Sequence, residues 1–294
     1  MSAITQQGPE TKTAPTPLWQ RIGRMVLAVL LRIALPVISI LVLWYGAIFW
    51  SGLPPFVLPR PERVLQALFT DWKLISLHLW YTLEVATIGF IMANLVGIGL
   101  AVLFVSFPLG RLLVMPAAIT LRNIPYVALV SVLALAMGDG MATKVIVVTL
   151  AGFFPVLVNT YRGLQSVESI VLDRMRILDA SWWEVFSTVR FPYSIPYIVA
   201  AQEITGSASI VVSIAVEWMI SRTGLGYVIN QSMMQYRGDL VYAVALIAAL
   251  LSFGIYTLIH YFGERLDWKD GSGTRRLRAD LLLQYNPLTS GVIQ

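Results

Sequence analysis

Residue types that commonly do chemistry are scarce in this sequence. It contains two histidines, His78 and His260, and no cysteine. Without cysteine there is no disulfide, no thiolate zinc site and no iron–sulfur cluster. Each histidine lies at one end of an apolar stretch, without the neighbouring partners that a catalytic base requires. We therefore expect this chain to have no catalytic residues, no metal site and no cofactor of its own.

Polar residues inside apolar segments are the remaining candidates. Arg122, Asn123 and Pro125 lie together in one such segment, and a charge at the centre of a bilayer costs about 2.5–3.5 kcal/mol. Pro125 removes a backbone donor and can bend a helix, and irregular backbone at that depth is tolerated where it lines a cavity. These residues are predicted to line a translocation path in which Arg122 attracts an anionic substrate. The alternatives are an Arg122 that pairs with Glu203 or Glu217, or one that lies nearer the end of its helix.

Glu217 is the other candidate for the path. It lies late in an apolar segment, just before Gly224-Leu225-Gly226. It is predicted to belong to an outer gate, and the alternative is a hydrogen bond that only holds helices together. A separate set of small residues, which we expect to allow close helix packing, comprises Gly89, Ala93, Gly97 and Gly99.

Composition places these candidates in a membrane protein. Of the 294 residues, 57% are hydrophobic and 13% are charged, whereas a soluble domain carries about 25% charged residues. A chain this apolar could not cover a globular surface with polar groups, so lipid is its solvent.

Six segments are long and apolar enough to cross the hydrocarbon core, which takes about 20 residues of helix. The predicted fold is therefore an all-α membrane protein with six transmembrane helices between residues 25 and 262. The spans are Met25–Trp50, Trp80–Phe107, Leu112–Met137, Thr143–Tyr161, Tyr193–Ile220 and Leu240–Phe262. The first span is too long for the apolar region of a signal peptide, and no cleavage site follows it.

The remaining segments are predicted to be tails and connections. Residues 1–24 and 263–294 are expected to form cytoplasmic tails. The proline-rich run Leu53–Pro61 should be extended, and Glu62–Trp72 has the spacing of a short amphipathic helix on the membrane surface.

The distribution of positive charge orients the spans. With a cytoplasmic N-terminus the inside loops hold thirteen Lys and Arg residues and the outside loops hold five, which satisfies the positive-inside rule with both termini inside. This asymmetry accounts for the net charge of +5, so no nucleic-acid partner is required. The inside set is Lys12, Arg21, Arg24, Arg111, Arg162, Arg174, Arg176, Arg190, Arg265, Lys269, Arg275, Arg276 and Arg278, and the outside set is Arg60, Arg63, Lys73, Arg222 and Arg237.

The inside loop of residues 162–192 is the most informative segment. Its pattern predicts a short helix, a bend near Asp179–Ala180 and a second helix that ends before Pro192. A compact helix pair with one apolar face could transmit force from a soluble motor to the attached spans. The residues alone leave a second interpretation equally open, in which the loop is a connector whose two tryptophans, Trp182 and Trp183, rest at the bilayer interface.

This loop resembles the EAA motif of binding-protein-dependent ABC importer permeases. Asp173 takes the acidic position, Ala180-Ser181 matches the bend, Phe186 matches the aromatic position and Phe191-Pro192 matches a Leu-Pro pair. Arg174 and Met175 replace two alanines, and Asp179 replaces the bend glycine. The resemblance implies that the loop couples to an ATPase through Asp173, Arg174, Arg176, Asp179, Ala180, Ser181, Trp182 and Phe186.

The resemblance covers roughly residues 50 to 265. Within this family, the sequence is similar to the nitrate/sulfonate/taurine subgroup. Further matching segments are Leu58–Val64, Leu121–Pro125, Gly152–Pro155 with Asn159-Thr160, and Thr223–Gly226. It implies the type I importer fold, with five core helices and one peripheral helix, in a bacterial inner membrane. It also implies a homodimer, two cytoplasmic ATPase subunits that bind ATP and Mg, and an external substrate-binding protein.

The sequence indicates that a separate subunit supplies ATP hydrolysis, and other classes of function remain as alternatives. It has no Gly-x-x-x-x-Gly-Lys-Ser/Thr loop, so ATP-driven transport requires a partner. An ion-coupled secondary transporter is the alternative, and it would favour inverted repeats and a carboxylate relay. An intramembrane hydrolase would need a central Ser–His or carboxylate pair, and a scaffold would not explain the loop.

Overall fold

The computed structural model describes residues 18–266, with side chains from Ala34 to Arg265. Within that range every regular element is helical. Residues 18–24 of the predicted N-terminal tail already belong to the first helix, α1 (Leu18–Ser51). Most of the predicted C-terminal tail lies outside the described residues. Contacts divide the chain into two units at Pro61, and each is described by itself.

The first unit contains α1 and the proline-rich segment that follows it. The apolar window Ala34–Ser51 has no side chain buried within the protein, as expected of a helix that faces lipid. The Trp44 indole N–H donates to the Pro59 carbonyl over 3.0 Å, which folds the segment back along the helix end.

The second unit begins with two helices joined by a single residue. The predicted surface helix is confirmed as α2 (Pro61–Thr70). After Asp71 the long helix α3 (Trp72–Ser106) starts, so the predicted start at Trp80 is wrong. Polar residues such as Ser76 and His78 lower the local hydropathy, yet His78 and Ile75 are buried and the helix continues through them.

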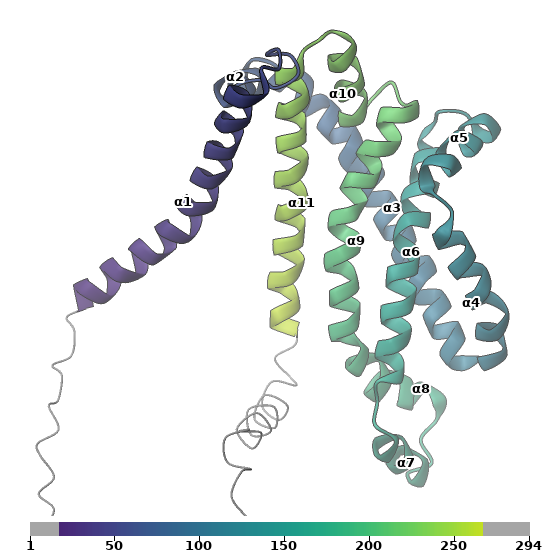
Figure 1. The fold of residues 1–294 in the computed structure, drawn as a ribbon. Helices are drawn as coiled ribbons and strands as arrows, with labels where there is room; N and C mark the ends of the chain where they lie inside the picture. Colours follow the sequence, from purple (N-terminus) through teal and green to yellow (C-terminus); the bar gives the residue numbers. More distant parts are fainter. Residues whose placement is uncertain (1–17, 267–294) are drawn as a thin grey trace, which may run out of the picture. The chain divides into compact units, whose positions relative to one another are not determined.

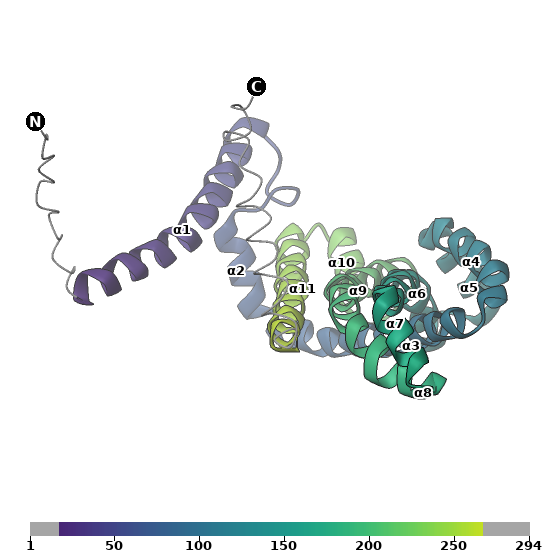
Figure 2. The ribbon, with the colours of Figure 1, turned by 90° about the horizontal axis from the view of Figure 1, so that it is seen from below.

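The other spans pack around α3. They are α6 (Met141–Gln165), α9 (Phe191–Ile220) and α11 (Gly238–Leu266), which confirm the fourth, fifth and sixth predicted spans. Figures 1 and 2 show α11, α9 and α6 side by side in that order, with α3 packed against α6 and α9. Five helices are long and apolar enough to cross a membrane, or six spans if a bent pair is counted as one.

The bent pair is the predicted third span. It consists of α4 (Pro108–Asn123) and α5 (Tyr126–Met137), which meet at an angle of 95°. Ile124 and Pro125 are extended at the junction. The predicted bend at Pro125 is therefore confirmed as a complete break, since proline disfavours helical backbone in the residue before it.

Small residues bring α3 and α6 close together. Ala93 is fully buried, and a Cβ added at Gly97 would lie 2.8 Å from the Phe153 carbonyl oxygen of α6. An added Cβ at Gly99 would meet nothing within 4 Å. The predicted packing face therefore includes Gly97 but not Gly99, because residues two apart point to different sides of a helix.

A surface ion pair ties the start of α3 to the helix α10 (Leu225–Met234) and the turn before α11. The Arg237 guanidinium donates to both Asp71 carboxylate oxygens, over 3.2 and 2.5 Å. This hydrogen bonding raises the pKa of Arg237 above its ordinary value, so its guanidinium stays charged. It holds together the polar ends of three helices.

Candidate functional site

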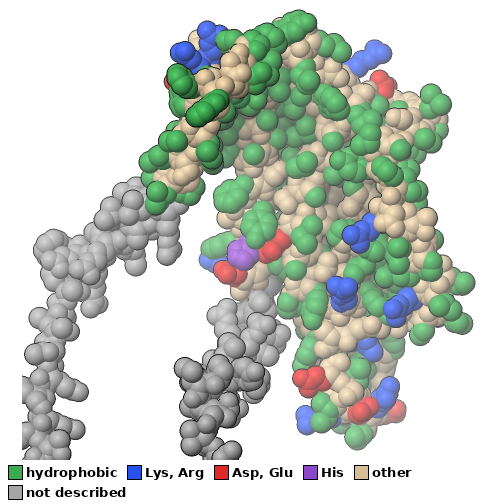
Figure 3. Space-filling view, in the orientation of Figure 1, with side chains coloured by type: hydrophobic (Ala, Val, Ile, Leu, Met, Phe, Trp, Pro, Cys, Tyr) green, Lys and Arg blue, Asp and Glu red, His purple; other side chains and the backbone are tan. Residues whose placement is uncertain are grey.

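A hairpin of two short helices projects from one end of the bundle. It contains α7 (Ser169–Ile177) and α8 (Trp182–Val185), and Figure 1 shows both beyond the ends of α6 and α9. Figure 3 shows acidic and basic side chains gathered on this projecting tip. We call residues 169–186 the coupling hairpin.

The predicted bend at Asp179–Ala180 is confirmed. The Ala180 N–H donates to the Met175 carbonyl and the Asp179 N–H donates to the Arg176 carbonyl, each over 3.0 Å. This pair of bonds is a Schellman motif, in which the residue after the helix adopts a left-handed conformation. Asp179 has that conformation, with φ of 51°. A glycine is usual there, and aspartate is one of the few other residues that adopts it at low cost.

A capping box starts α8 directly after the bend. The Ser181 hydroxyl accepts the Glu184 N–H over 3.3 Å, and the Glu184 carboxylate accepts the Ser181 N–H over 2.7 Å. Glu184 was not among the predicted site residues. The spacing Ser-x-x-Glu is the signal that could have identified it. Together the bend and the cap fix the angle between the two helices.

The hairpin runs into α9 without a break, so the predicted end of the second helix before Pro192 is wrong. Residues Phe186–Arg190 form one π-helical turn, in which the Phe191 N–H donates to the Phe186 carbonyl. Pro192 lacks an N–H and its ring would clash with a carbonyl one turn earlier. The wider turn removes this conflict and keeps the helix continuous.

The base of the hairpin is clamped to α6. Arg190 donates to the Leu164 carbonyl, in the last turn of α6, over 2.9 Å. Gly163 lies so near α9 that an added Cβ would be 2.9 Å from the Ser194 Cα. The base of the hairpin is therefore attached to both α6 and α9.

The tip of the hairpin exposes large apolar side chains. Ile177 is 84% exposed and Leu178 is 74% exposed, with Trp182 and Trp183 also exposed beside them. Phe186 stacks on both tryptophans, with ring centroids 5.2 and 5.7 Å apart. Polar motif residues surround this patch: Asp173 and Arg176 form an exposed ion pair of 3.1 Å, and Arg174 is exposed. The structure thus brings the predicted coupling residues together on one projection.

A buried polar junction occupies the opposite end of α9. The Glu217 carboxylate is fully buried, and its Oε2 accepts the Thr82 hydroxyl over 2.7 Å and the Gly226 N–H over 3.2 Å. Thr82 also accepts the Leu225 N–H, and His78 Nδ1 accepts the Gly224 N–H over 3.0 Å. These bonds join α3, α9 and the start of α10. A role of Glu217 in a gate stays a prediction.

Tight glycine packing completes this junction. Gly224 has φ of 95°, a conformation that side chains rarely adopt. An added Cβ at Gly226 would collide with the Ile214 carbonyl oxygen. His78 and Thr82 were not predicted as parts of a site, because their contacts come from residues 135 to 146 positions later in the chain.

Arg122 lies at the break between α4 and α5. Its guanidinium is 4.8 Å from the centre of the Phe154 ring of α6, and its side chain is exposed. It does not pair with Glu203 or Glu217: Glu203 contacts His260, over 2.8 Å, and Glu217 belongs to the junction. The alternative of an internal ion pair is therefore wrong.

A second arginine, about three turns earlier in α4, repeats this arrangement over a ring about two turns later in α6. Arg111 of α4 lies 4.9 Å from the centre of the Tyr161 ring of α6. Tyr161 follows Phe154 by seven residues, which places both rings on one face. Figure 3 shows basic side chains grouped over the lower parts of α4 and α6, above the hairpin. Asn123 and Pro125 are exposed beside this group.

The known proteins with similar sequences are transport permeases. Residues 87–268 match the family model of binding-protein-dependent transport system inner membrane components. A probable ABC transporter permease of Haemophilus influenzae is 28% identical over 81% of this chain and 98% of its own length. A formylaminopyrimidine transport permease of Halalkalibacterium halodurans is 28% identical, covering 73% and 86%. A putative aliphatic sulfonates transport permease of Bacillus subtilis is 25% identical, covering 64% and 71%.

The fold is also found in a solved structure. The MetNI methionine ABC transporter, in an inward-facing conformation, contains a chain that superposes with a TM-score of 0.60 and 17% identity, over 67% of this chain and 98% of that one. The resemblance of the loop to the EAA motif, the helical fold and the family model all agree. The family model matches more than half of the residues of this chain. The chain therefore belongs to the binding-protein-dependent transport system inner membrane components. It is a permease subunit of an ABC importer, a transport protein whose ATPase is a separate subunit.

Proposed function

We propose that this permease forms the translocation path for a small anionic solute and is driven through its coupling hairpin. In this proposal two copies of the chain face each other, and two cytoplasmic ATPase subunits bind ATP and Mg. A substrate-binding protein delivers the solute from outside, and both termini of the permease lie in the cytoplasm. ATP binding draws the ATPases together and switches the path between its two openings.

The observation that carries the coupling role is the exposed apolar tip of a rigid projection. Aromatic side chains bury about 150–250 Å² each, and they dominate the energetics of many interfaces. The tip presents two of them beside Ile177 and Leu178. Its shape is fixed by the Schellman turn and the capping box, so little conformational entropy is lost on docking.

The continuity of α9 gives this docking a mechanical consequence. The second helix of the hairpin, α8, forms one helical path with the π turn and α9, from Trp182 to Ile220. That path ends at the junction around Glu217, where α3 and α10 are attached. A force applied to the tip therefore reaches the far end of the bundle through a single element, which is what alternating access requires.

Two arginines support an anionic solute. The guanidiniums of Arg122 and Arg111 lie over aromatic rings rather than against carboxylates. A ring face leaves the five N–H donors of each guanidinium available to an anion. The relatives carry names that refer to solutes of different chemistry, so this inference rests on the arginines of this chain.

Replacing Arg122 tests the path. In the transporter reconstituted with its ATPase and binding protein, Arg122→Gln should lower ATP-driven uptake roughly tenfold or more, because hydrogen bonds to charged groups contribute about 1.5–3 kcal/mol. Arg122→Lys keeps the charge and should retain part of the uptake. Arg63→Gln, at an exposed arginine of α2, is the matched control and should transport normally. Unchanged uptake and solute preference in Arg122→Gln would remove the arginine from the path.

A further inference from the structure

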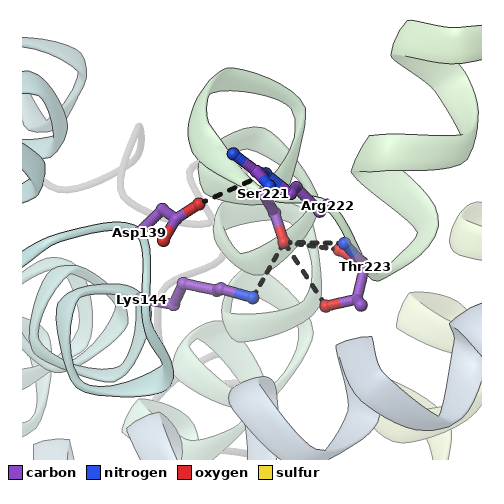
Figure 4. A network of polar contacts seen from close by, with 5 residues as sticks. All are labelled: Asp139, Lys144, Ser221, Arg222 and Thr223. Carbon is purple, nitrogen blue, oxygen red and sulfur yellow. Dashed lines mark hydrogen bonds and ion pairs between the residues drawn. The ribbon is translucent and has the colours of Figure 1, made fainter.

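An open pocket of about 550 Å³ lies where α3, α6 and the end of α9 meet. It is at the opposite end of α6 from the coupling hairpin. Its walls include Tyr81 and Glu84 of α3, Lys144 of α6 and Ser221 after α9. Figure 4 shows the Lys144 side chain reaching across to Ser221, with the neighbouring pair Asp139 and Arg222 beside them.

Lys144 is a buried ammonium with unused hydrogen-bonding capacity. Its residue is 7% exposed, and its Nζ donates to the Ser221 hydroxyl over 2.8 Å. Ser221 is itself fixed, because it donates to the Thr223 carbonyl over 2.6 Å and accepts the Thr223 N–H over 3.1 Å. An ammonium has three donors, and among the described residues Lys144 forms this one hydrogen bond.

The surrounding charges leave an anion position open at Lys144. Glu217, buried behind the pocket, interacts with the Lys144 charge at longer range. Its Oε2 accepts hydrogen bonds from Thr82 and Gly226, whereas its Oε1 has no hydrogen-bond partner among the described residues. Asp139 is paired with Arg222 over 3.8 Å, and both side chains are exposed. Buried charges require partners in direct contact, and a neutral hydroxyl only partly meets that requirement.

Glu84 gives the same pocket a second, opposite charge. It is exposed on the α3 wall, and no ion pair within the described residues engages it. The pocket therefore offers a recessed cation and a more open carboxylate on different helices. Its volume is within the range of about 300–1,000 Å³ that is usual for small-molecule sites.

We propose that this pocket binds a small zwitterionic solute, whose anionic group takes the unused donors of Lys144 and whose cationic group lies toward Glu84. The proposal rests on the proposed transport function and refines its solute: the anionic group proposed there is held at Lys144, and a cationic group accompanies it. A small molecule fits these observations better than a docked protein does, because the ammonium is recessed and a protein surface would meet the exposed Asp139–Arg222 pair first.

Three probes that share a two-carbon chain separate the two charges. Taurine carries a sulfonate and an ammonium, ethanesulfonate carries only the anion and ethylamine only the cation. Each is titrated against the full-length permease in lipid nanodiscs, without its ATPase, and binding is followed by saturation-transfer NMR. Taurine should bind with the lowest Kd of the three.

Variants assign each charge to its partner. Lys144→Met, of similar length, should raise the Kd of both sulfonates about tenfold or more, since a charge-assisted hydrogen bond is lost. Lys144→Arg should retain much of the binding and shows that the pocket still folds. Glu84→Gln should weaken taurine but not ethanesulfonate. Lys73→Met, at an exposed lysine of α3 outside the pocket, should change neither.

Two results would overturn the proposal. One is an equal Kd for taurine in Lys144→Met and in the unaltered chain, or no saturation transfer from the unaltered chain at all. The other is normal solute binding in the pocket variants together with a lost affinity for the binding protein, which would make this face a protein-docking surface. Because no ATPase is present, either result leaves the role of the coupling hairpin standing.

Discussion

Glutamates in place of Ile177 and Trp183 should abolish ATP-driven uptake while leaving the permease folded. Both side chains are exposed at the tip of the coupling hairpin, and interface residues of this kind contribute about 2 kcal/mol or more each when they anchor a partner. Two charged replacements should weaken docking of the ATPase roughly 100-fold or more. Solute-stimulated ATP hydrolysis by the reconstituted complex should fall with uptake, since both depend on the same contact.

A matched variant separates lost coupling from lost structure. The pair Ile177→Leu with Trp183→Phe keeps the apolar surface and should retain most of the uptake. Substitutions of exposed residues usually change the free energy of unfolding by no more than about 0.5 kcal/mol, so the glutamate variant should melt at the same temperature as the unaltered chain. Normal uptake by the glutamate variant would show that the tip does not carry the drive.

Alanine at Gly97 should destabilise the bundle, whereas alanine at Gly99 should not. The new methyl group at position 97 would lie 2.8 Å from both the Phe153 carbonyl oxygen and Val156 Cβ. Val156 is fully buried, so α3 and α6 must separate. Overpacking of this kind costs about 1–3 kcal/mol. At Gly99 there is open space, and replacing glycine within a helix gains about 1 kcal/mol in soluble hosts.

The two glycines make a controlled experiment because they share one helix. Thermal unfolding of the detergent-solubilised permease should show a lower midpoint for Gly97→Ala and an equal or higher one for Gly99→Ala. Equal midpoints in both variants would mean that α3 and α6 do not approach as closely as their backbones indicate. The reverse order would place the packing face on the other side of α3.

The features that could be predicted from sequence are those with local causes. Hydropathy located five helices long enough to span a membrane, or six spans with the bent pair counted as one. Pro125 marked the break in that pair, and the pattern of residues 162–192 marked the bend at Asp179–Ala180. The start of α3 was missed because its first turns carry the polar residues Lys73, Ser76 and His78, although His78 is buried. The spacing of Ser181 and Glu184 was a local signal that went unused.

The features that could not be predicted depend on contacts across the fold. Glu217 was identified as unusual, but its partner Thr82 is 135 residues away. Lys144 is at the edge of a predicted span and was not predicted as a site residue. Its contact with Ser221 and its place in the pocket depend on how the helices pack. Arg122 was identified from its type and depth, whereas its contact with Phe154 required the packing of α4 on α6.

These features give α9 a central position. One end continues through the π turn into the coupling hairpin, and the other end holds the buried junction beside the Lys144 pocket. The clamp from Arg190 to α6 adds the second helix that lines that pocket. An ATPase bound at the tip could therefore alter the solute pocket by moving two helices.

Cross-linking from the hairpin tip tests this account most directly. The chain has no cysteine, so Leu178→Cys introduces a single thiol at an exposed position of the tip. Met234→Cys places a control thiol at an exposed position of α10. In native membranes treated with a short thiol–thiol cross-linker, position 178 should join the permease to a protein that contains a P-loop, in a yield that changes when ATP is added. If the thiol at 178 is reactive but joins no such ATPase, or if position 234 joins it equally well, the hairpin is not the site at which ATP hydrolysis drives this permease.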